Sequence, residues 1–314
     1  MPHARCTKAD QMRPVMTSEA VALPNPPSDR PAGPANPAPG SAVSAQGNGA
    51  ARPQENGAAA AQVNGARASL AAEARLAAEL AEERHVALEL QRAILPLHDE
   101  PFDLPGLRTM VRYLPASAGR VGGDWYVTAD MPGGQVLIAI GDVAGHGLAA
   151  AAGMARLRGA LAGLAITGSP PERLVGWLND LVRHVAPEHT ASVIAGYFDP
   201  PSRTLTWAQA GHPPPILVRG STARPLEPPA GILLGAGTEG YDAATLALAA
   251  GDLLLLYSDG LIERRNRSVE AGLTVLAEAV RGITDPEHAI TAALHALGSA
   301  DLEDDTCLVA LHVL

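Results

Sequence analysis

The sequence predicts an α+β domain in which helices pack on antiparallel sheets, preceded by a helical linker and a disordered N-terminal tail. Three observations support this fold class. Short apolar or β-branched runs recur in clusters, separated by turn residues. Helical segments come in two pairs between these clusters, whereas single helices alternating with strands would indicate a parallel sheet. The first 66 residues differ in composition from everything that follows.

Residues 1–66 consist mainly of Pro, Ala, Gly, Asn and Ser, as in the stretch 31–37. The chain contains 27 prolines and 32 glycines, and many of the prolines lie in its first third. Such a segment cannot bury enough apolar surface to offset the entropy lost on ordering. We therefore expect a disordered tail, which is either a solvated linker or a docking segment that orders on a partner.

Residues 67–96 predict a helical linker. Ala, Glu, Leu and Arg dominate between 68 and 95 without Gly or Pro, and these residues favour helix until Pro96 ends it. An approximate heptad seam, interrupted by Glu83, indicates either a short coiled coil that pairs two chains or a helix docked on its own domain. The seam consists of Leu76, Leu80, Ala87, Leu90 and Ile94.

Residues 97–314 predict one domain containing both strands and helices. Residues 199–203 are typical of a hairpin turn between two of the strands. Pro171 and Pro286 suit the first turn of a helix. The strand candidates are 109–113, 136–140, 192–199, 204–210, 215–218, 253–257 and 306–314. The helix candidates are 148–164, 171–185, 271–280 and 286–298.

Charge and composition exclude several classes of protein. The net charge of −10 argues against nucleic-acid binding, which needs a cationic surface. Cys6 and Cys307 lie at opposite ends of the chain, so no disulfide framework is expected and a reducing cytoplasm fits. The longest Ala/Leu stretch, 148–166, contains Arg156 and Arg158 and predicts an amphipathic helix instead of a membrane span. We expect a soluble, cytoplasmic protein with no membrane or nucleic-acid partner.

Four aspartates in tight turns are the strongest functional signal. Three adjoin longer apolar runs and one precedes a short one, and strand ends are where a sheet can direct several carboxylates to one place. They are Asp124, Asp142, Asp259 and Asp304. Hard oxygen ligands of this kind suit Mg²⁺ or Mn²⁺ better than zinc. Any one motif could be ordinary turn chemistry, but four together indicate a two-metal hydrolase.

These motifs, in their order, resemble the SpoIIE/RsbU-type bacterial serine phosphatases of the metal-dependent PP2C-like (PPM) superfamily. The resemblance covers roughly residues 85–314 and includes the helical Leu-Gln-Arg-Ala-Ile-Leu-Pro at 90–96. It also includes Gly-Gly-Asp at 122–124, Gly-Asp-Val-Ala-Gly-His-Gly at 141–147, Ala-Gly-His-Pro-Pro at 210–214 and Ser-Asp-Gly at 258–260. The family implies a β-sandwich of two antiparallel sheets flanked by helices, with metals at one end.

The resemblance also implies a ligand set. Asp142 would bridge two Mn²⁺ or Mg²⁺ ions, and Asp124 with the backbone carbonyl of Val143 would complete one of them. Asp259 and Asp304 would hold the other. Two close divalent ions lower the pKa of a water and orient it for in-line attack on phosphorus, so no nucleophilic side chain is needed.

Four further residues have two interpretations each. Arg120 resembles a phosphate-binding arginine, or it is a solvated loop residue. His146 is a candidate general acid, or it helps to open the following helix. His212 closes a strand turn in preference to binding a ligand, and Asp305 either supports Asp304 or is simply exposed.

The expected function is a metal-dependent protein serine/threonine phosphatase. In this family the usual substrate is a phosphoserine on a STAS-domain anti-anti-sigma regulator in a partner-switching pathway. The helix at 68–95 would be the regulatory element and a possible site of homodimerisation. Two alternatives are a catalytically idle dimeric adaptor, against which the complete set of aspartates argues, and a two-metal hydrolase of small phosphoesters.

Overall fold

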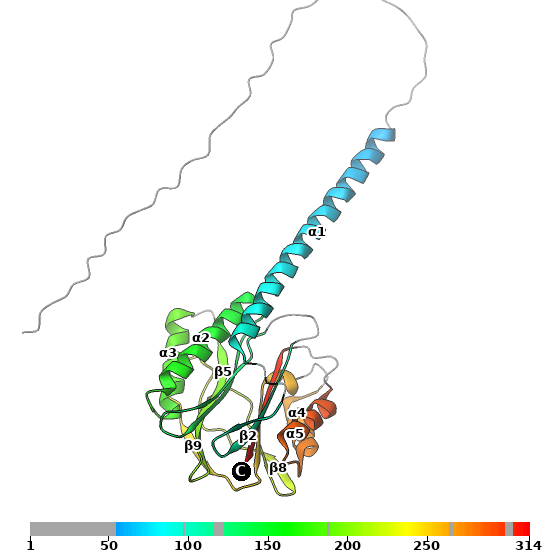
Figure 1. Cartoon of the computed structure of the whole chain (residues 1–314). Coiled ribbons are helices and arrows are strands. Elements are labelled where there is room, and N and C mark those ends of the chain that lie inside the picture. Colours follow the sequence, from blue (N-terminus) through cyan, green and yellow to red (C-terminus); the bar gives the residue numbers. More distant parts are fainter. Residues whose placement is uncertain are drawn as a thin grey trace, which may run out of the picture. The chain divides into compact units, whose positions relative to one another are not determined.

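The computed structural model describes residues 55–96, 98, 100–115, 122–186, 189–263, 267–298 and 304–314. Residues 59–314 form one compact unit in which two antiparallel sheets stack face to face between helices (Figure 1). This arrangement confirms the predicted α+β class. No helix in the described ranges is both long and apolar enough to cross a membrane.

Two sheets of unequal size make up the sandwich. The six-stranded sheet has the order β1-β2-β11-β10-β7-β8, and the five-stranded sheet has the order β3-β4-β5-β6-β9. The strands of the first are β1 Phe102–Leu104, β2 Leu107–Leu114, β11 Thr306–Val313, β10 Leu253–Tyr257, β7 Ile216–Arg219 and β8 Thr222–Pro225. Those of the second are β3 Trp125–Asp130, β4 Val136–Val143, β5 Ala191–Asp199, β6 Thr204–Ala210 and β9 Ala243–Ala247.

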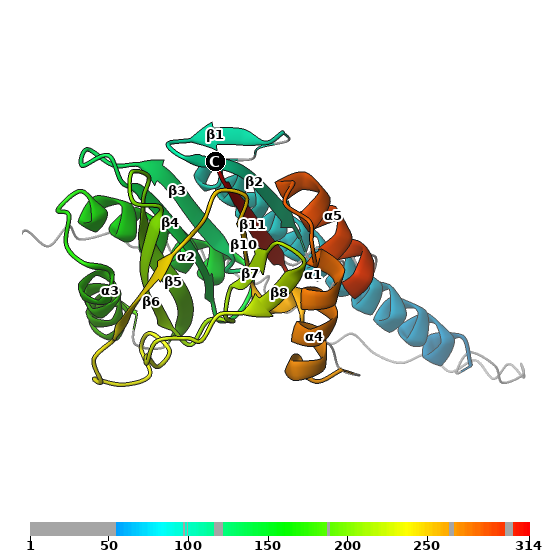
Figure 2. The same ribbon diagram turned by 90° about the horizontal axis from the view of Figure 1, so that it is seen from below.

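Each sheet is covered by its own pair of helices (Figure 2). Helices α2 (Leu148–Ala165) and α3 (Pro171–Val185) pack on the five-stranded sheet. Helices α4 (Val269–Val280) and α5 (Pro286–Leu297) pack on the six-stranded sheet. Pro171 and Pro286 occupy the first turns of α3 and α5, as predicted from the fixed backbone angle of proline.

Strand β11 shows why the six-stranded sheet is apolar on both faces. Alternate side chains of a strand point to opposite faces. Cys307 and Val309 accordingly join the core shared with the five-stranded sheet, whereas Leu308 and Ala310 join the core beneath α4 and α5. Burial on both sides produces the uninterrupted apolar sequence from which this strand was predicted.

Helix α1 runs from Glu55 to Ile94, so it starts before the predicted linker boundary at residue 67. The run of alanines at 58–61 has a high helix propensity, which offsets the cost of the nearby glycines. Only residues 1–54 of the predicted tail lie outside the described residues. Strands β1, β3, β8 and β9 were not among the predicted strands either. Strand β1 has only three residues, and β3 was expected only as a short apolar run at 125–127. Strands β8 and β9 are short and rich in Ala, Thr and Pro that are mostly exposed.

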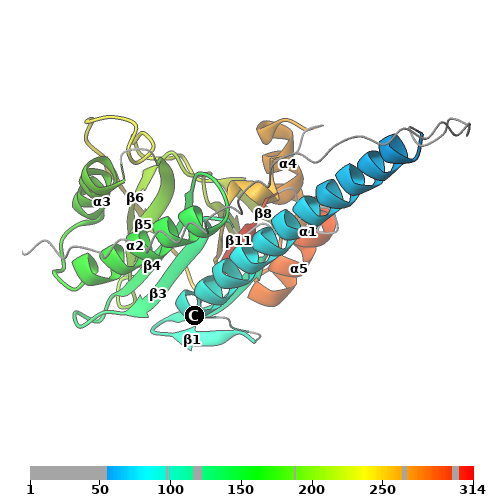
Figure 3. The same cartoon turned by 90° about the horizontal axis from the view of Figure 1, so that it is seen from above.

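The C-terminal turns of α1 dock on the domain near β2 (Figure 3). Ala87 and Leu95 are buried in the main core, and Gln91 contacts Tyr113 of β2. Earlier in the helix, Leu76 is 57% exposed and Leu80 is 56% exposed. The predicted seam is therefore divided: its last positions pack within the chain, and pairing of two chains through its first positions stays a prediction.

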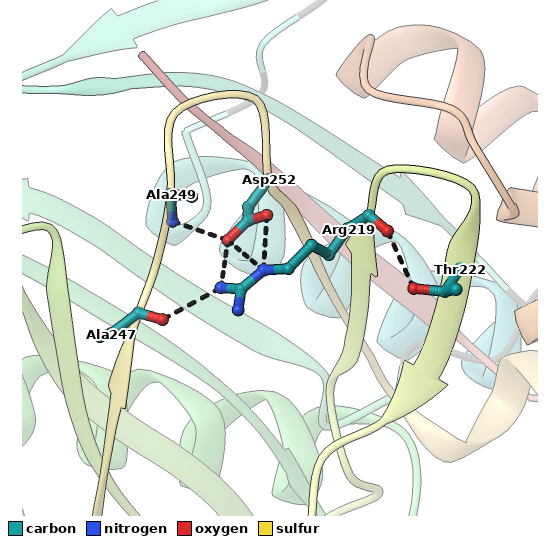
Figure 4. A network of polar contacts seen from close by, with 5 residues as sticks. All are labelled: Arg219, Thr222, Ala247, Ala249 and Asp252. Carbon is teal, nitrogen blue, oxygen red and sulfur yellow. Dashed lines mark hydrogen bonds and ion pairs between the residues drawn. The ribbon is translucent and has the colours of Figure 1, made fainter.

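A polar network fixes the other end of the sandwich (Figure 4). Asp252, directly before β10, accepts hydrogen bonds from Nε of Arg219 at 2.9 Å and from the backbone N–H of Ala249 at 2.8 Å. The Arg219 guanidinium also donates to the carbonyl of Ala247 at 3.0 Å. The bonds tie the β7–β8 hairpin to the loop between β9 and β10, so the sheets are fixed at the end far from the four aspartates.

Candidate metal centre

The four predicted aspartates come from turns at one end of the sandwich. Asp124 directly precedes β3, and Asp142 lies near the end of β4, which pairs antiparallel with β3. Asp259 follows β10, and Asp304 precedes β11, its antiparallel neighbour. Antiparallel pairing places the start of one strand beside the end of the next. Each sheet therefore contributes two of the aspartates.

Ser258 connects the two sheets at this end. Its hydroxyl donates a hydrogen bond to the carboxylate of Asp124 at 2.6 Å, although the two residues belong to different sheets. The same oxygen accepts from the backbone N–H of Cys307 at 2.9 Å. Ser258 is fully buried, and Asp124 is 2% exposed. The serine therefore fixes the orientation of a buried carboxylate.

The carboxylates influence one another's ionisation. Burial raises the pKa of Asp124 well above its usual value, and the charge of Asp142 raises it further, although the Ser258 hydrogen bond opposes the shift. Burial, followed by repulsion from Asp259 and other carboxylates, raises the pKa of Asp142 to about 7. Burial, followed by the charges of Glu263 and Asp304, raises the pKa of Asp259 to about 6. The end of the sandwich is a partly buried concentration of negative charge.

A glycine brings the carbonyl of Val143 close to these carboxylates. The backbone N–H of Val143 donates to the carbonyl of Gly123 at 3.2 Å. A Cβ atom at Gly123 would lie only 2.1 Å from the Val143 oxygen, so any side chain there would push the two segments apart. The sequence Gly-Gly-Asp is needed for this close approach as well as for the turn.

The donor chemistry of these residues fits a divalent cation. Carboxylate and carbonyl oxygens are the ligands that Mg²⁺ and Mn²⁺ take, and a cation would relieve the repulsion that raises the aspartate pKa values. Among the residues that the structure describes, no three His, Cys, Asp or Glu side chains form a group that could already enclose an ion. The carboxylates interact through their charges, and Asp304 is exposed.

Asp305 is the buried member of its pair, which decides between its two interpretations. It is 3% exposed and accepts hydrogen bonds from the backbone N–H of Gly122 at 2.6 Å and from Nε2 of Gln91 at 3.4 Å. The hydroxyl of Tyr113 donates to the same carboxylate. Burial, with the nearby carboxylates, raises the pKa of Tyr113, which keeps the phenol protonated. Asp305 thus joins α1, β2 and the turn that carries Asp124.

The structure describes only one of the two remaining candidates, Arg120 and His146. Arg120 falls outside the described residues. His146 is exposed between Gly145 and Gly147, whose φ angles are 107° and 79°. The turn opens α2, which starts at Leu148 as predicted. A general-acid role for His146 stays a prediction.

His212 is buried at the turn after β6, and its role there extends beyond closing that turn. It is 4% exposed, and Gly211 before it has a φ of 61°. The imidazole contacts Ser192 and the backbone of Tyr257, which belong to different sheets.

A comparison with known protein families identifies the family of this chain. Residues 132–314 match the Stage II sporulation protein E (SpoIIE) family. The chain belongs to the SpoIIE family. It is also 27% identical over 198 residues to phosphoserine phosphatase RsbU of Bacillus subtilis (strain 168), a match that covers 60% of this chain. This SpoIIE-family chain spans about half of that relative, 56% of its length.

Solved structures agree with the fold. The RsbU and RsbW domains of Rv1364c from Mycobacterium tuberculosis are 31% identical to this chain, with a TM-score of 0.60. That match covers 67% of this chain and 60% of the other. RsbX in complex with magnesium is 16% identical, with a TM-score of 0.54 over 68% of this chain and 99% of its own. The PP2C-like sandwich implied by the sequence is confirmed.

The sequence analysis assigned no role to Ser258 and left two interpretations open for Asp305, although signals for both were present. Ser258 sits directly before Asp259 at the end of an apolar strand, where a hydroxyl is enclosed by both sheets. Asp305 is two residues before Cys307, and residues two apart share a face of a strand. Because Cys307 faces the core between the sheets, Asp305 faces inward and Asp304 outward.

Proposed function

We propose that the chain is a metal-dependent protein serine phosphatase. The observation that carries the proposal is the group of interacting carboxylates contributed by both sheets of a SpoIIE-family fold. No single turn motif would support it, since Asp-Gly turns are common. Carboxylates that raise one another's pKa values are unfavourable for folding, which indicates that they are kept for a function.

The residues divide into two sets of ligands. Asp124, Asp142 and the carbonyl of Val143 would hold one ion, and Asp142, Asp259 and Asp304 would hold the other. When bound, two Mn²⁺ or Mg²⁺ ions activate a water for attack on phosphorus and neutralise charge on the phosphoryl oxygens. Ser258 would keep Asp124 in a fixed orientation, as its 2.6 Å hydrogen bond indicates.

The proposed substrate is a phosphoserine on a STAS-domain regulator. Similarity to a phosphoserine phosphatase supports the phosphoserine. Similarity to a structure that contains RsbU and RsbW domains supports a partner-switching context. The exposed part of α1, with Leu76 and Leu80, is the proposed surface for homodimerisation and regulatory input.

Phosphate release tests the proposal. The wild type, Asp142→Asn and Asp130→Asn would each be given a phosphoserine STAS-domain protein or p-nitrophenyl phosphate, with and without Mn²⁺. Asp130 is exposed at the far end of β3, so its substitution is a matched control. We expect Mn²⁺-dependent release from the phosphoprotein by the wild type and by Asp130→Asn, and none by Asp142→Asn.

Other results would point to the alternatives. Release from the small ester alone, across several phosphoserine proteins, would indicate a small-phosphoester hydrolase. A folded wild type that binds Mn²⁺ but releases phosphate from neither substrate would indicate an adaptor and contradict the proposal. Undiminished release by Asp142→Asn would show that the reaction takes place elsewhere.

A further inference from the structure

His212 lies where the chain crosses between the two sheets. Strand β6 of the five-stranded sheet ends at Ala210, and β7 of the six-stranded sheet begins at Ile216. Gly211 turns the chain with a positive φ, and three prolines at 213–215 lead into β7. Histidine 212 is therefore placed between the sheets, at the end that carries the aspartates.

Both ring nitrogens of His212 have partners. Nδ1 lies 2.7 Å from the hydroxyl of Ser192 on β5, and Nε2 lies 3.2 Å from the carbonyl of Tyr257 on β10. A carbonyl can only accept, so Nε2 carries the proton and Nδ1 accepts from the serine. Burial lowers the pKa of the imidazole to about 3, which keeps it neutral. With both nitrogens engaged, His212 is not a free metal ligand.

The two partners of His212 adjoin the metal centre from opposite sheets. Ser192 is paired in register with Asp142 across β4 and β5. Tyr257 directly precedes Ser258 and Asp259. The imidazole therefore bonds to the cross-strand neighbour of Asp142 in one sheet and to a residue two positions before Asp259 in the other.

The crossover that presents the imidazole is itself fixed. Nε2 of Gln209 donates to the carbonyl of His212 at 2.8 Å, and the hydroxyl of Tyr257 donates to the carbonyl of Pro214 at 2.8 Å. A ring held at both nitrogens, on a backbone held at His212 and at Pro214, has little freedom to change its position. It sets a defined separation between β5 and β10.

We propose that His212 is a positioning residue, a bridge between the sheets that sets the spacing of Asp142 relative to Asp259 and Ser258. The proposal deepens the function proposed above and rests on it for the identity of the ions. Outer partners that orient ligands affect metal affinity by about 10- to 100-fold. An incorrect spacing would weaken the ion shared by both sheets and lower turnover with it.

Calorimetric titration with Mn²⁺ tests the bridge without a substrate. The full chain would be compared as wild type, His212→Phe, His212→Gln and Ser192→Ala, with His288→Gln as a control on a side chain that is 81% exposed. His212→Phe keeps a ring but loses both hydrogen bonds, so we expect Mn²⁺ affinity about 10- to 100-fold lower. Glutamine can donate and accept at once, so it should restore most of the affinity, and Ser192→Ala should be intermediate.

Circular dichroism and melting temperature separate this role from a merely structural one. A folded His212→Phe with wild-type Mn²⁺ affinity would overturn the proposal, even if its melting temperature fell. If His212→Phe does not fold, the deciding variant is Ser192→Ala. Wild-type Mn²⁺ affinity in folded Ser192→Ala would then overturn the proposal. A wild type that binds Mn²⁺ but has no phosphatase activity would contradict only the proposed function, and one that binds no Mn²⁺ would overturn both.

Discussion

The aspartate side chains at the candidate metal centre carry an electrostatic cost, because burial and mutual repulsion raise their pKa values. In the metal-free protein the pKa of Asp142 is raised to about 7 and that of Asp259 to about 6, from 3.8. The unfolded chain releases these protons at lower pH than the folded chain does. The stability that the bound protons contribute is present in full only below the unfolded-state pKa of 3.8 and is lost as the pH rises through 6 to 7.

The first prediction follows from this loss of stability with rising pH. In EDTA the melting temperature of the wild type should fall between pH 5 and pH 8, and Asp142→Asn should reduce the fall because an uncharged amide replaces a repelled carboxylate. At pH 8 the substitution should raise the melting temperature by roughly 2–4 °C, the shift for about 1 kcal/mol in a domain of this size. Scanning fluorimetry across this range checks it. An Asp142→Asn variant less stable than the wild type at pH 8 would contradict the account.

His146 can be tested through the leaving group. A general acid matters for the alkoxide of serine, which is a poor leaving group, and matters little for p-nitrophenolate. His146→Gln should therefore lower kcat on a phosphoserine protein, by about 100-fold or more if the histidine is the acid, and leave turnover of p-nitrophenyl phosphate nearly unchanged. An equal decrease in kcat on both substrates would show that His146 is not the general acid.

At the residue scale the sequence was most informative where function constrains it. The four aspartates and the glycine turns were predicted from motif order, and they lie at one end of the sandwich. The partners Ser258 and His212 were not predicted as supports, because their side-chain hydrogen bonds join residues 20 or more positions apart. Local patterns contain no information on such contacts.

Among the elements, helix α1 differs between its two ends. Its last turns pack on the core, and Gln91 reaches Asp305 beside the metal centre. Its earlier leucines are exposed, and apolar side chains repeated on one helix are typical of a surface that pairs. The helix therefore has one end packed on the domain and exposed leucines in its earlier turns, through which pairing with a second copy is predicted.

The corresponding prediction concerns association. If α1 pairs two chains, the wild type should sediment as a dimer, and the double substitution Leu76→Glu with Leu80→Glu should give a monomer because it places charges in the seam. Analytical ultracentrifugation across a range of concentrations checks it, with Glu79→Gln as the control on a neighbouring exposed position. A wild type that is monomeric at all concentrations would exclude pairing through this helix.

Element boundaries were predicted closely wherever burial is strong. Three elements have the predicted limits: strands β6 and β10 and helix α3. In each, the apolar pattern of the sequence matches the residues that the fold buries. The predicted start of α1, residue 67, was about three turns too late, since a mostly alanine segment with two glycines gives no clear signal in either direction. The edge strands β8 and β9 were missed because exposed edges do not need apolar residues.

At the scale of the whole molecule, the sandwich brings together two pairs of aspartates, the two halves of the proposed metal centre. One sheet provides Asp124 and Asp142, and the other provides Asp259 and Asp304. Ser258 and His212 hold the sheets together at this end, and the Arg219–Asp252 network holds them at the other. The fold class and the family were predictable from the order of motifs, whereas the way in which the sheets are joined required the structure.

The central claim is that aspartates from both sheets form one metal centre, and Mn²⁺ binding measured by calorimetry tests it most directly. The wild type would be compared with single substitutions of one aspartate from each sheet, Asp142→Asn and Asp259→Asn, and with Asp130→Asn as the control. We predict that both substitutions weaken binding and that the control does not. Wild-type affinity in both variants would contradict the claim, because it would show that Mn²⁺ binds without these carboxylates.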